Sequence, residues 1–442
     1  MSAQTASKAP ADMPPSSQPS FADALKTWAL IGVTSFGGPA GQIALMHKIL
    51  VEEKRWLSER TYLIALNFCT LLPGPEAMQL ATYAGWRLHG TLGGLAAGLL
   101  FVTPGALLIL LLSALYAVYG TQPLVSATFL GIKAAVLAIV IEALLRISRR
   151  SLKHGAEWLI AGLAFVAIYF FKVPFPIIVL AAGVIGYVFL HQNPNADQHA
   201  AANTPVPFRQ TLATAAIWLA VWLLPLLAIA AIAGMDHVLV KLALFFSKLA
   251  IVTFGGAYAV LAYVAQDAVQ HYGWLQPGEM LDGLGLAETT PGPLILVTQF
   301  VGFLAGYRSG AAYPMLMGIL GALVVLWSTF APCFLWIFTG APYIERIASM
   351  PRLKSALSAI TAAVTGVILN LSVWFALHII FADVPERVTG PLRFSYPVLT
   401  SIDWLAAVLA ILAAFMLFKL HFGMLRVLAL SAVLALAVKA SL

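Results

Sequence analysis

The fold is decided by a short stretch, Ser35-Phe36-Gly37-Gly38, that returns in the second half of the chain as Thr253-Phe254-Gly255-Gly256. A second motif, Pro73-Gly74-Pro75, returns in the same register as Pro291-Gly292-Pro293. Rare patterns that recur at one fixed offset indicate an internal repeat, which must be recognised before a fold is assigned. The chain therefore consists of two related halves.

Two further features extend the repeat. Trp56-Leu57 matches Trp274-Leu275 at the same offset as the first two motifs. Beyond this point the offset increases by ten, since Pro104 matches Pro332. The additional positions fall between two apolar segments of the second half, near 306–314.

The composition assigns the chain to a membrane. Hydrophobic residues make up 61% of the 442 positions, charged residues make up 10%, and the mean hydropathy is +0.91. Soluble domains carry roughly 25% charged residues. Apolar stretches of about 20 residues, long enough for a helix to cross a bilayer, recur throughout the chain. We expect a multi-pass protein of the bacterial inner membrane whose surface contacts lipid.

Each half contains six apolar segments, and one unpaired segment near 211–234 brings the total to thirteen. The paired segments lie at 22–46, 62–86, 91–119, 123–147, 156–171 and 174–190, and at 238–264, 280–306, 311–340, 355–382, 401–418 and 422–441. We predict an all-α polytopic membrane protein with four parts. These are a disordered cytoplasmic tail (1–20), a first repeat (21–190), a polar linker with one extra transmembrane helix (191–237) and a second repeat (238–442).

The unpaired helix predicts that the second half is inverted relative to the first. If each half crosses the membrane an even number of times, one extra crossing turns the second half upside down, a common plan among transporters. The loop at 48–60 carries four Lys and Arg residues, whereas its counterpart carries Asp267, Glu279 and Asp282 and no Lys or Arg. Equivalent loops of opposite charge are expected on opposite sides of the membrane.

Charge counting favours re-entrant hairpins for the segments that contain the glycine and proline motifs. With the intramembrane Lys133 and Lys248 left out, thirteen crossings would divide the remaining 23 Lys and Arg residues 13 to 10. If the first two segments of each half enter and leave on one side, the division is 17 to 6. Since cytoplasmic loops are enriched in Lys and Arg, we predict nine crossings, four re-entrant hairpins and a cytoplasmic N-terminus.

The two motifs form the candidate substrate site. Gly costs about 1 kcal/mol and Pro about 3 kcal/mol inside a helix, and broken backbone at membrane depth is tolerated only within protein or beside a wet cavity. A helix that restarts after such a break presents free N–H groups and about half a positive charge, which favours an anion. Packing kinks are the alternative interpretation, but the recurrence of both motifs favours a site. The candidate binding residues are Ser35, Phe36, Gly37, Gly38, Pro73, Gly74, Pro75, Thr253, Phe254, Gly255, Gly256, Thr289, Thr290, Pro291, Gly292 and Pro293, with Thr34 as a further hydroxyl.

Ionisable side chains inside the membrane are functional candidates by default. Lys133 either pairs with an anionic substrate or forms a structural ion pair with a buried Glu. Glu142 lies in the same segment, Glu76 follows the first Pro-Gly-Pro, and Glu288 precedes the second by three residues. We assign these three carboxylates as candidate gating or coupling groups. The alternative role for Glu76 and Glu288 is charge balance with Arg87, Lys248 or Arg308.

Several classes of function are disfavoured. The Lys and Arg residues lie in short loops between apolar segments, which is a topology signal and not a nucleic-acid surface. The sequence contains no HExxH, GxGxxG or Walker lysine loop, so no metal, cofactor or ATP site is predicted. Cys69 and Cys333 lie in apolar segments and are expected to be buried packing residues. Whether two copies form a homodimer is left open.

The motifs resemble those of the chromate ion transporter family in its long, two-domain form. The resemblance rests on residues 34–40, 56–57 and 72–76 in the first half and on 253–257, Trp274 and 288–293 in the second. It covers about 22–190 and 238–441. The resemblance implies a secondary transporter that exports chromate from the bacterial cytoplasm, with chromate resistance and some relation to sulfate. Chromate and sulfate are both tetrahedral dianions, which agrees with the anion site.

Two alternatives to a chromate exporter remain at this stage. The first is a carrier of sulfate or another oxyanion. The second is an intramembrane enzyme that uses Glu76 and Glu288 on a lipid-borne substrate, since paired carboxylates perform acid–base chemistry. These two residues occupy non-equivalent repeat positions, and no nucleophile or metal set accompanies them. Transport is therefore favoured, and no catalytic residue is assigned.

Overall fold

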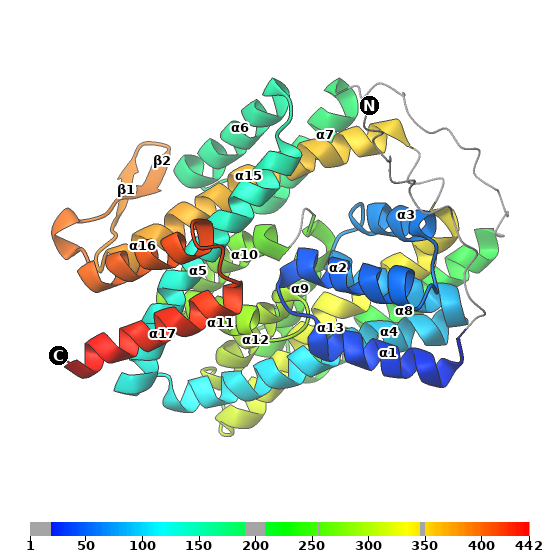
Figure 1. Cartoon of the computed structure of the whole chain (residues 1–442), viewed down its shortest axis with the longest axis horizontal. Coiled ribbons are helices and arrows are strands. Elements are labelled where there is room, and N and C mark those ends of the chain that lie inside the picture. The colour runs from blue at the N-terminus through cyan, green and yellow to red at the C-terminus, as the bar shows by residue number, and fades with distance from the viewer. Residues whose placement is uncertain (1–18, 191–207, 255–256, 345–349, 442) are drawn as a thin grey trace, which may run out of the picture.

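The computed structural model describes residues 19–190, 208–254, 257–344 and 350–441. The predicted tail lies almost wholly outside these ranges, as does most of the polar linker. Within them the protein is helical apart from one short β-hairpin (Figure 1). The first half comprises α1 (Phe21–Thr34), α2 (Gly38–His47), the π-helical turn η1 (Lys48–Glu53), α3 (Glu59–Cys69), α4 (Glu76–Tyr119), α5 (Pro123–Ser151), α6 (Gly155–Phe171) and α7 (Phe175–Phe189).

The helix α8 (Phe208–Ala233) leads to the second half, which repeats the same order of elements. It comprises α9 (Val238–Val252), α10 (Ala257–Gln266), η2 (Asp267–His271), α11 (Pro277–Thr289), η3 (Leu294–Leu296), α12 (Val297–Tyr307), α13 (Pro314–Gly340), η4 (Ala341–Tyr343), α15 (Pro351–Ile380), η5 (Leu399–Ser401), α16 (Trp404–Phe418) and α17 (Met424–Ser441). The antiparallel hairpin β1 (Glu386–Thr389) and β2 (Leu392–Ser395) lies between α15 and α16. This hairpin was not predicted from the sequence, and the first half has no counterpart in its described residues.

Six helices in the described part of the chain, α4, α5, α8, α13, α15 and α17, are long and apolar enough to cross a membrane. The shorter apolar helices are α6, α7, α16 and the segments Val260–Val269 and Leu294–Tyr307, so helix length alone does not separate crossings from re-entrant arms. The four segments that carry the motifs are instead each divided into two arms. The 14-residue α1, for example, is about 21 Å long, which is less than the hydrocarbon core of about 30 Å.

The chain reverses direction within α4. His89 and Gly90 have non-helical backbone angles, and Gly90 has a φ of +61°. On either side of this turn Gly85 lies against Gly93, so the arm at 76–88 runs antiparallel to the crossing helix at 91–119. The second half reverses in the same way, since Gly302 of α12 lies against Gly321 of α13. Here the turn is a loop at 308–313, which accounts for most of the additional positions in the second half.

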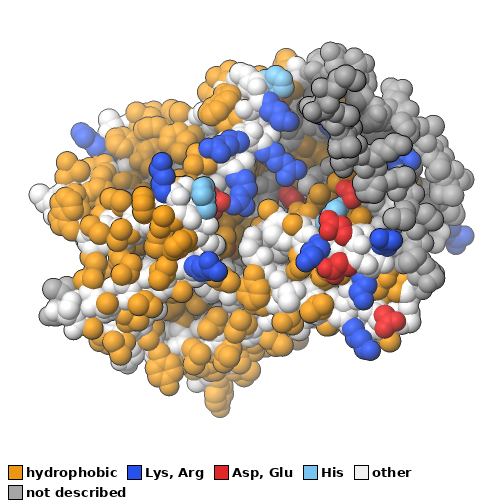
Figure 2. All heavy atoms as spheres, in the orientation of Figure 1, with side chains coloured by type: hydrophobic (Ala, Val, Ile, Leu, Met, Phe, Trp, Pro, Cys, Tyr) orange, Lys and Arg blue, Asp and Glu red, His pale blue; other side chains and the backbone are white. Residues whose placement is uncertain are grey.

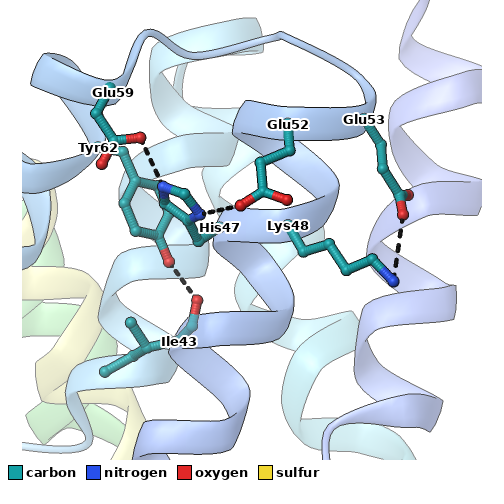
Figure 3. A network of polar contacts seen from close by, with 7 residues as sticks. All are labelled: Ile43, His47, Lys48, Glu52, Glu53, Glu59 and Tyr62. Atoms are coloured by element: carbon teal, nitrogen blue, oxygen red, sulfur yellow. Dashed lines mark hydrogen bonds and ion pairs between the residues drawn. The ribbon is translucent and has the colours of Figure 1, made fainter. Parts of the chain in front are cut away.

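A polar network joins the arms α2 and α3 at the end remote from the glycine motif (Figure 3). The two ring nitrogens of His47 lie 3.1 Å from Glu52 and 2.6 Å from Glu59, and Tyr62 donates to the carbonyl oxygen of Ile43 at 2.6 Å. The end of α2 thus contacts the start of α3, so these two arms are antiparallel. In the second half the ring of Trp274, in the turn before α11, packs on Phe246 of α9.

Equivalent crossing helices of the two halves run in opposite directions. The ring of Phe338 in α13 packs on Gly94 of α4, and the ring of Phe334 packs on Gly98. The two helices are therefore antiparallel. This is the relation expected of two inverted halves.

The outer helices are exchanged between the halves. Gly366 of α15 lies against the backbone of Ala161 in α6, and α7 also packs on α15. Reciprocally, α16 and α17 pack on α5, where Gly131 meets the carbonyl oxygen of Ser431. These six helices form the upper and left part of the molecule in Figure 1, with α1, α2 and α3 on the right. Each half is thus completed by the last two helices of the other.

Reciprocal backbone hydrogen bonds join the four chain breaks in the interior. The N–H of Gly74 donates to the carbonyl oxygen of Thr253 at 2.9 Å, and the N–H of Gly292 donates to that of Ser35 at 2.8 Å. The two donors are repeat counterparts of each other and so are the two acceptors, so the two bonds are equivalent. Each half supplies the partner for a backbone group that the other half leaves open, as buried N–H and C=O groups require.

The close packing of the exchanged helices predicts that a larger side chain is not tolerated at Gly131. A Cβ at this position would lie 2.1 Å from the Ser431 carbonyl oxygen, whereas a Cβ at Gly162 in α6 meets no heavy atom within 4 Å. We expect Gly131→Leu to destabilise the protein by about 1–3 kcal/mol or more, as overpacking does. The control Gly162→Leu should leave the thermal midpoint of the purified protein unchanged or slightly raised, because Gly is a poor helix former. Equal midpoints for the two variants would contradict the described packing.

A second prediction separates the two Pro-Gly-Pro breaks. Gly74 has a φ of +119° and Gly292 a φ of +94°, so Ala carries at least the penalty of about 1–2 kcal/mol for left-handed backbone at either position. A Cβ on Gly74 would also lie 2.8 Å from Nε2 of Gln79 and 3.0 Å from Sγ of Cys333, whereas the nearest atom to one on Gly292 is 3.3 Å away. We expect Gly74→Ala to lower the thermal midpoint more than Gly292→Ala does. A larger decrease for Gly292→Ala than for Gly74→Ala would contradict the close contacts described at Gly74.

Candidate functional site

The two glycine breaks have the same sequence pattern but different surroundings. In the first half Phe36 is 38% exposed and Gly37 is exposed, although Ser35 between α1 and the break is fully buried. In the second half Thr253 is buried and Phe254 is partly buried. Gly255 and Gly256, which were assigned to the site from the sequence, lie outside the described residues. Among the described residues, a solute therefore has access to the first break only.

The two proline breaks show the same difference. Pro73 is partly exposed and Pro291 is buried. The helix after each break begins without a side-chain cap, at Glu76 in the first half and at Leu294 in the second, and α2 likewise begins after Gly37 without one. The N–H groups in the first turn of a helix have no partner within the helix. The start of α2 is partly exposed, whereas Gly74, Pro75 and the first turn of α4 after Glu76 are buried. Both helix starts have the donors and the partial positive charge that attract an anion.

Two glutamines that were not predicted from the sequence brace the breaks. Nε2 of Gln42 donates to the carbonyl oxygen of Gly292 at 2.6 Å, and Nε2 of Gln79 donates to that of Pro73 at 2.7 Å. In the described part of the chain their Oε1 atoms and Oγ of Ser35 are buried and have no hydrogen-bond partner. The repeat counterparts of the glutamines are Val260 and Val297, so the repeat itself gave no signal for them.

The threonines beside the breaks donate their protons to their own helices. Each hydroxyl lies between 2.5 and 3.1 Å from a carbonyl oxygen three or four residues earlier, in Thr34, Thr253, Thr289 and Thr290. We predicted all four as hydrogen-bond donors for a substrate, and in this conformation none of these protons is directed to one. Ser35 is the hydroxyl of that predicted set for which no acceptor is found among the described residues.

Lys133 forms an ion pair across the two halves. Its Nζ lies 3.2 Å from Oδ2 of Asp282, which also accepts a hydrogen bond from Tyr116 at 2.7 Å. We treated Asp282 as a loop residue, and this was wrong: it lies in α11 and is 3% exposed. The repeat counterparts of Lys133 and Asp282 are Thr361 and Ile64, so the ion pair exists on one side of the molecule only.

The predicted carboxylates have other neighbours than the basic residues we proposed. Glu288 is buried and accepts a hydrogen bond from Tyr258 at 2.7 Å. Glu142 is bonded to Arg146 on the next turn of α5. Arg308 instead forms a two-fold ion pair with Glu279, and Lys248 lies over the ring of Tyr263. Within the described ranges the suggested pairing of Glu76 or Glu288 with Arg87, Lys248 or Arg308 is not found.

Arg146 and Arg150 are functional candidates that were not predicted from the sequence. They follow Glu142 at intervals of four residues, so all three side chains share one face of α5. This spacing was visible in the sequence, but the two arginines had been counted as topology signals at the end of a crossing helix. Figure 2 shows Lys and Arg side chains gathered across the middle of one face, over the part of the molecule where α5 runs in Figure 1.

Equivalent arms of the two halves pack on different helices. α11 packs on α5 and α10 packs on α15, whereas within the described ranges α3 and α2 pack on α4 and have no comparable packing on α15 and α5. Leu281 of α11 is fully buried, whereas its counterpart Leu63 in α3 is 45% exposed. Gly285 of α11 lies against Ile132 of α5, whereas its counterpart Asn67 is exposed. The arms beside the second-half breaks are therefore more deeply buried than those beside the first.

Cys69 and Cys333 are buried free thiols, as predicted, and Cys333 lies beside the first Pro-Gly-Pro.

Comparison with known proteins identifies the family to which the chain is similar. Residues 22–187 and 240–436 match the chromate transporter family. No solved structure matches the chain.

Relatives match over most of their length. The chromate transport protein of Pseudomonas aeruginosa is 34% identical over 410 residues, which cover 91% of this chain and 92% of the relative. The probable chromate transport protein of Synechococcus elongatus is 31% identical over 81% of this chain and 85% of its own. The chromate transport protein of Cupriavidus metallidurans is 28% identical over 81% and 83%. The enzyme hypothesis is dropped, because the matched residues cover both halves of a transporter: this multi-pass membrane protein belongs to the chromate transporter family.

Proposed function

We propose that this protein is a secondary carrier that exports chromate from the cytoplasm and thereby confers chromate resistance. Chromate as the substrate is supported by the names of the relatives from Pseudomonas aeruginosa and Cupriavidus metallidurans. An inside-negative membrane potential favours the exit of a dianion by about 2.3 kcal/mol per charge per 100 mV. No ATP site is needed for this direction of transport.

The joining of the four breaks by reciprocal backbone bonds is the observation that carries the proposal. Broken helices whose ends meet near the middle of inverted halves are how many carriers bind an ion. The dianion is proposed to bind at the accessible breaks, residues 35–38 and 73–75, against the helix starts at Gly38 and Glu76. The equivalent residues of the second half, 253–256 and 289–293, are proposed to take over when the opposite side opens.

Alternating access follows from the unequal packing of equivalent arms. In the described conformation α10 and α11 close one side against α15 and α5, and Lys133 with Asp282 joins α5 to α11 on that side. In the other conformation α2 and α3 are proposed to pack on α5 and α15 while α10 and α11 separate from them. Lys133 would then act in closing one side. Glu288 lies beside the closed break. Its surroundings and those of Glu142 are proposed to change when the two conformations exchange.

The open side is proposed to be the cytoplasmic one. The loop at 48–60, the turn at His89 and the last turn of α5 all lie at this end in the re-entrant topology, and they carry much of the basic charge of the chain. Cytoplasmic loops are enriched in Lys and Arg. The described conformation then corresponds to the state that takes up substrate from the cytoplasm.

The second candidate function is a carrier of sulfate or another oxyanion, and the chemistry of the donors at the breaks is consistent with it. The donors at the accessible breaks are backbone N–H groups and one serine hydroxyl, which recognise charge and tetrahedral shape and not the identity of the central atom. Competition between the two anions at the same site is the means of deciding.

Chromate uptake into everted membrane vesicles tests the function. We expect vesicles that contain the protein to accumulate chromate, and a Pro73→Ala/Pro291→Ala variant, expressed at the same level, to lose accumulation because the helix starts at the breaks are lost. Loss of uptake in excess sulfate would show that the site also binds sulfate, and the concentration of sulfate required would measure how selective the site is. Vesicles made leaky with a pore-forming peptide are the control, since accumulation by a carrier requires a sealed compartment. Absence of chromate uptake despite verified expression would refute the proposed substrate.

Cysteine labelling tests the re-entrant topology. Cys69 and Cys333 are buried, so exposed cysteines introduced by Glu53→Cys, Arg87→Cys and Arg387→Cys should dominate the labelling by a membrane-impermeant maleimide. We expect the first two to be labelled from the cytoplasmic side and the third from the opposite side. Labelling of Glu53→Cys and Arg87→Cys from opposite sides would mean that the arms cross the membrane, and the re-entrant topology would have to be abandoned.

A further inference from the structure

One face of α5 carries a row of charges in the last three turns of the helix. Glu142, Arg146 and Arg150 follow one another at intervals of four residues, and a carboxylate oxygen of Glu142 is bonded to the guanidinium of Arg146. The side chain of Glu142 is 30% exposed and that of Arg146 is 55% exposed. Arg150 is exposed as well. Both guanidiniums are thus accessible to a solute that enters on the open side.

The row begins beside the second proline break. α11 packs along α5, with Asp282 bonded to Lys133 and Gly285 against Ile132 and Val136. Glu288 lies about one turn further along α11, three residues before the second Pro-Gly-Pro, and accepts a hydrogen bond from Tyr258. The packing of the two helices therefore places Glu288 toward the part of α5 that carries Glu142.

The row has no equivalent in the second half. The repeat counterparts of the three residues are Asn370, Trp374 and His378 in α15. Trp374 is buried, and the Nδ1 of His378 lies 2.9 Å from its carbonyl oxygen. The cationic face thus belongs to the open side alone, which is where a dianion must first be attracted.

We propose that Arg146 and Arg150 bind the tetrahedral dianion on the open side before it reaches the breaks, and that Glu142 occupies Arg146 in its absence. This inference rests on the proposed transport of a dianion. A guanidinium offers paired N–H donors that match two oxygens of an oxyanion. A carboxylate that holds Arg146 in the empty state avoids an unpaired charge at the edge of the membrane interior.

The balance of charge predicts the sign of each substitution. In the empty protein the guanidinium of Arg146 is bonded to the carboxylate of Glu142. An arriving dianion must therefore displace this carboxylate before it can bind Arg146. Removal of an arginine should weaken dianion binding, whereas removal of the Glu142 charge should strengthen it. A purely structural ion pair predicts no gain in affinity from either change.

Anion-dependent thermal stabilisation of the purified full chain tests the inference without requiring transport. Chromate, and in parallel sulfate, is titrated into wild type and into Arg146→Gln, Arg146→Lys, Arg150→Gln and Glu142→Gln variants. Binding to the folded state raises the thermal midpoint with ligand concentration. We expect the apparent Kd to rise about tenfold or more in Arg146→Gln and Arg150→Gln, the scale of a hydrogen bond to a charged group. Arg146→Lys should fall between wild type and Arg146→Gln, and Glu142→Gln should have a lower Kd than wild type.

Arg60→Gln is the matched control, because Arg60 is exposed on the first turn of α3 and its removal changes the net charge equally. Its apparent Kd should stay within about twofold of wild type. The inference is overturned if neither anion stabilises wild type, if Arg60→Gln weakens binding as much as the two arginine variants, or if Glu142→Gln binds no more tightly. Stabilisation by an anion together with no chromate uptake into vesicles would refute the proposed function and leave the binding site standing. If Arg146→Gln does not fold, Arg150→Gln in the last turn of α5 decides.

Discussion

The structure depends on the pair of backbone hydrogen bonds that join the breaks of one half to the breaks of the other. A broken helix inside a membrane leaves N–H and C=O groups that lipid cannot satisfy. Here the Gly74 N–H donates to Thr253 and the Gly292 N–H donates to Ser35. Each of these groups finds its partner in the opposite half, so the two halves must associate with these residues in contact. The exchange of α6 and α7 for α16 and α17 around α5 and α15 enforces the same association from outside.

Most of the fold was predictable because its signals are local or repeated. The motif offsets identified two halves, the glycine and proline positions identified the broken segments, and the asymmetry of Lys and Arg predicted nine crossings. What could not be predicted depends on which helices meet. The partner of Lys133 is Asp282, in a helix of the other half, and no spacing in the sequence connects them. The β-hairpin at 386–395 has no repeat copy, so the comparison of halves gave no sign of it.

The broken backbone of the candidate site could be predicted from the sequence, whereas the side-chain contacts around it could not, and the assignment of these residues to a substrate stays a prediction. Phe-Gly-Gly and Pro-Gly-Pro were recognisable because helix-breaking residues in apolar segments conflict with local propensity, and such conflicts often mark function. Gln42 and Gln79, which hold the breaks through carbonyl oxygens, gave no such conflict. The threonines were misjudged for a related reason. A sequence shows that a hydroxyl is near a break but not that a carbonyl oxygen in the preceding turn accepts its proton.

The two sides of the membrane can be distinguished only by residues that differ between the two halves of the repeat. Two equivalent halves can exchange conformations, but equivalence alone gives no difference between the two sides of the membrane. The differences lie in charged residues without charged counterparts. Lys133 and Asp282 correspond to Thr361 and Ile64 in the repeat, and the Glu142–Arg146–Arg150 row corresponds to uncharged or aromatic residues. In the proposed cycle the ion pair holds one side closed and the row attracts the dianion on the other. The backbone is nearly symmetric between the halves, and the proposal assigns the difference between the two sides to these few charged side chains.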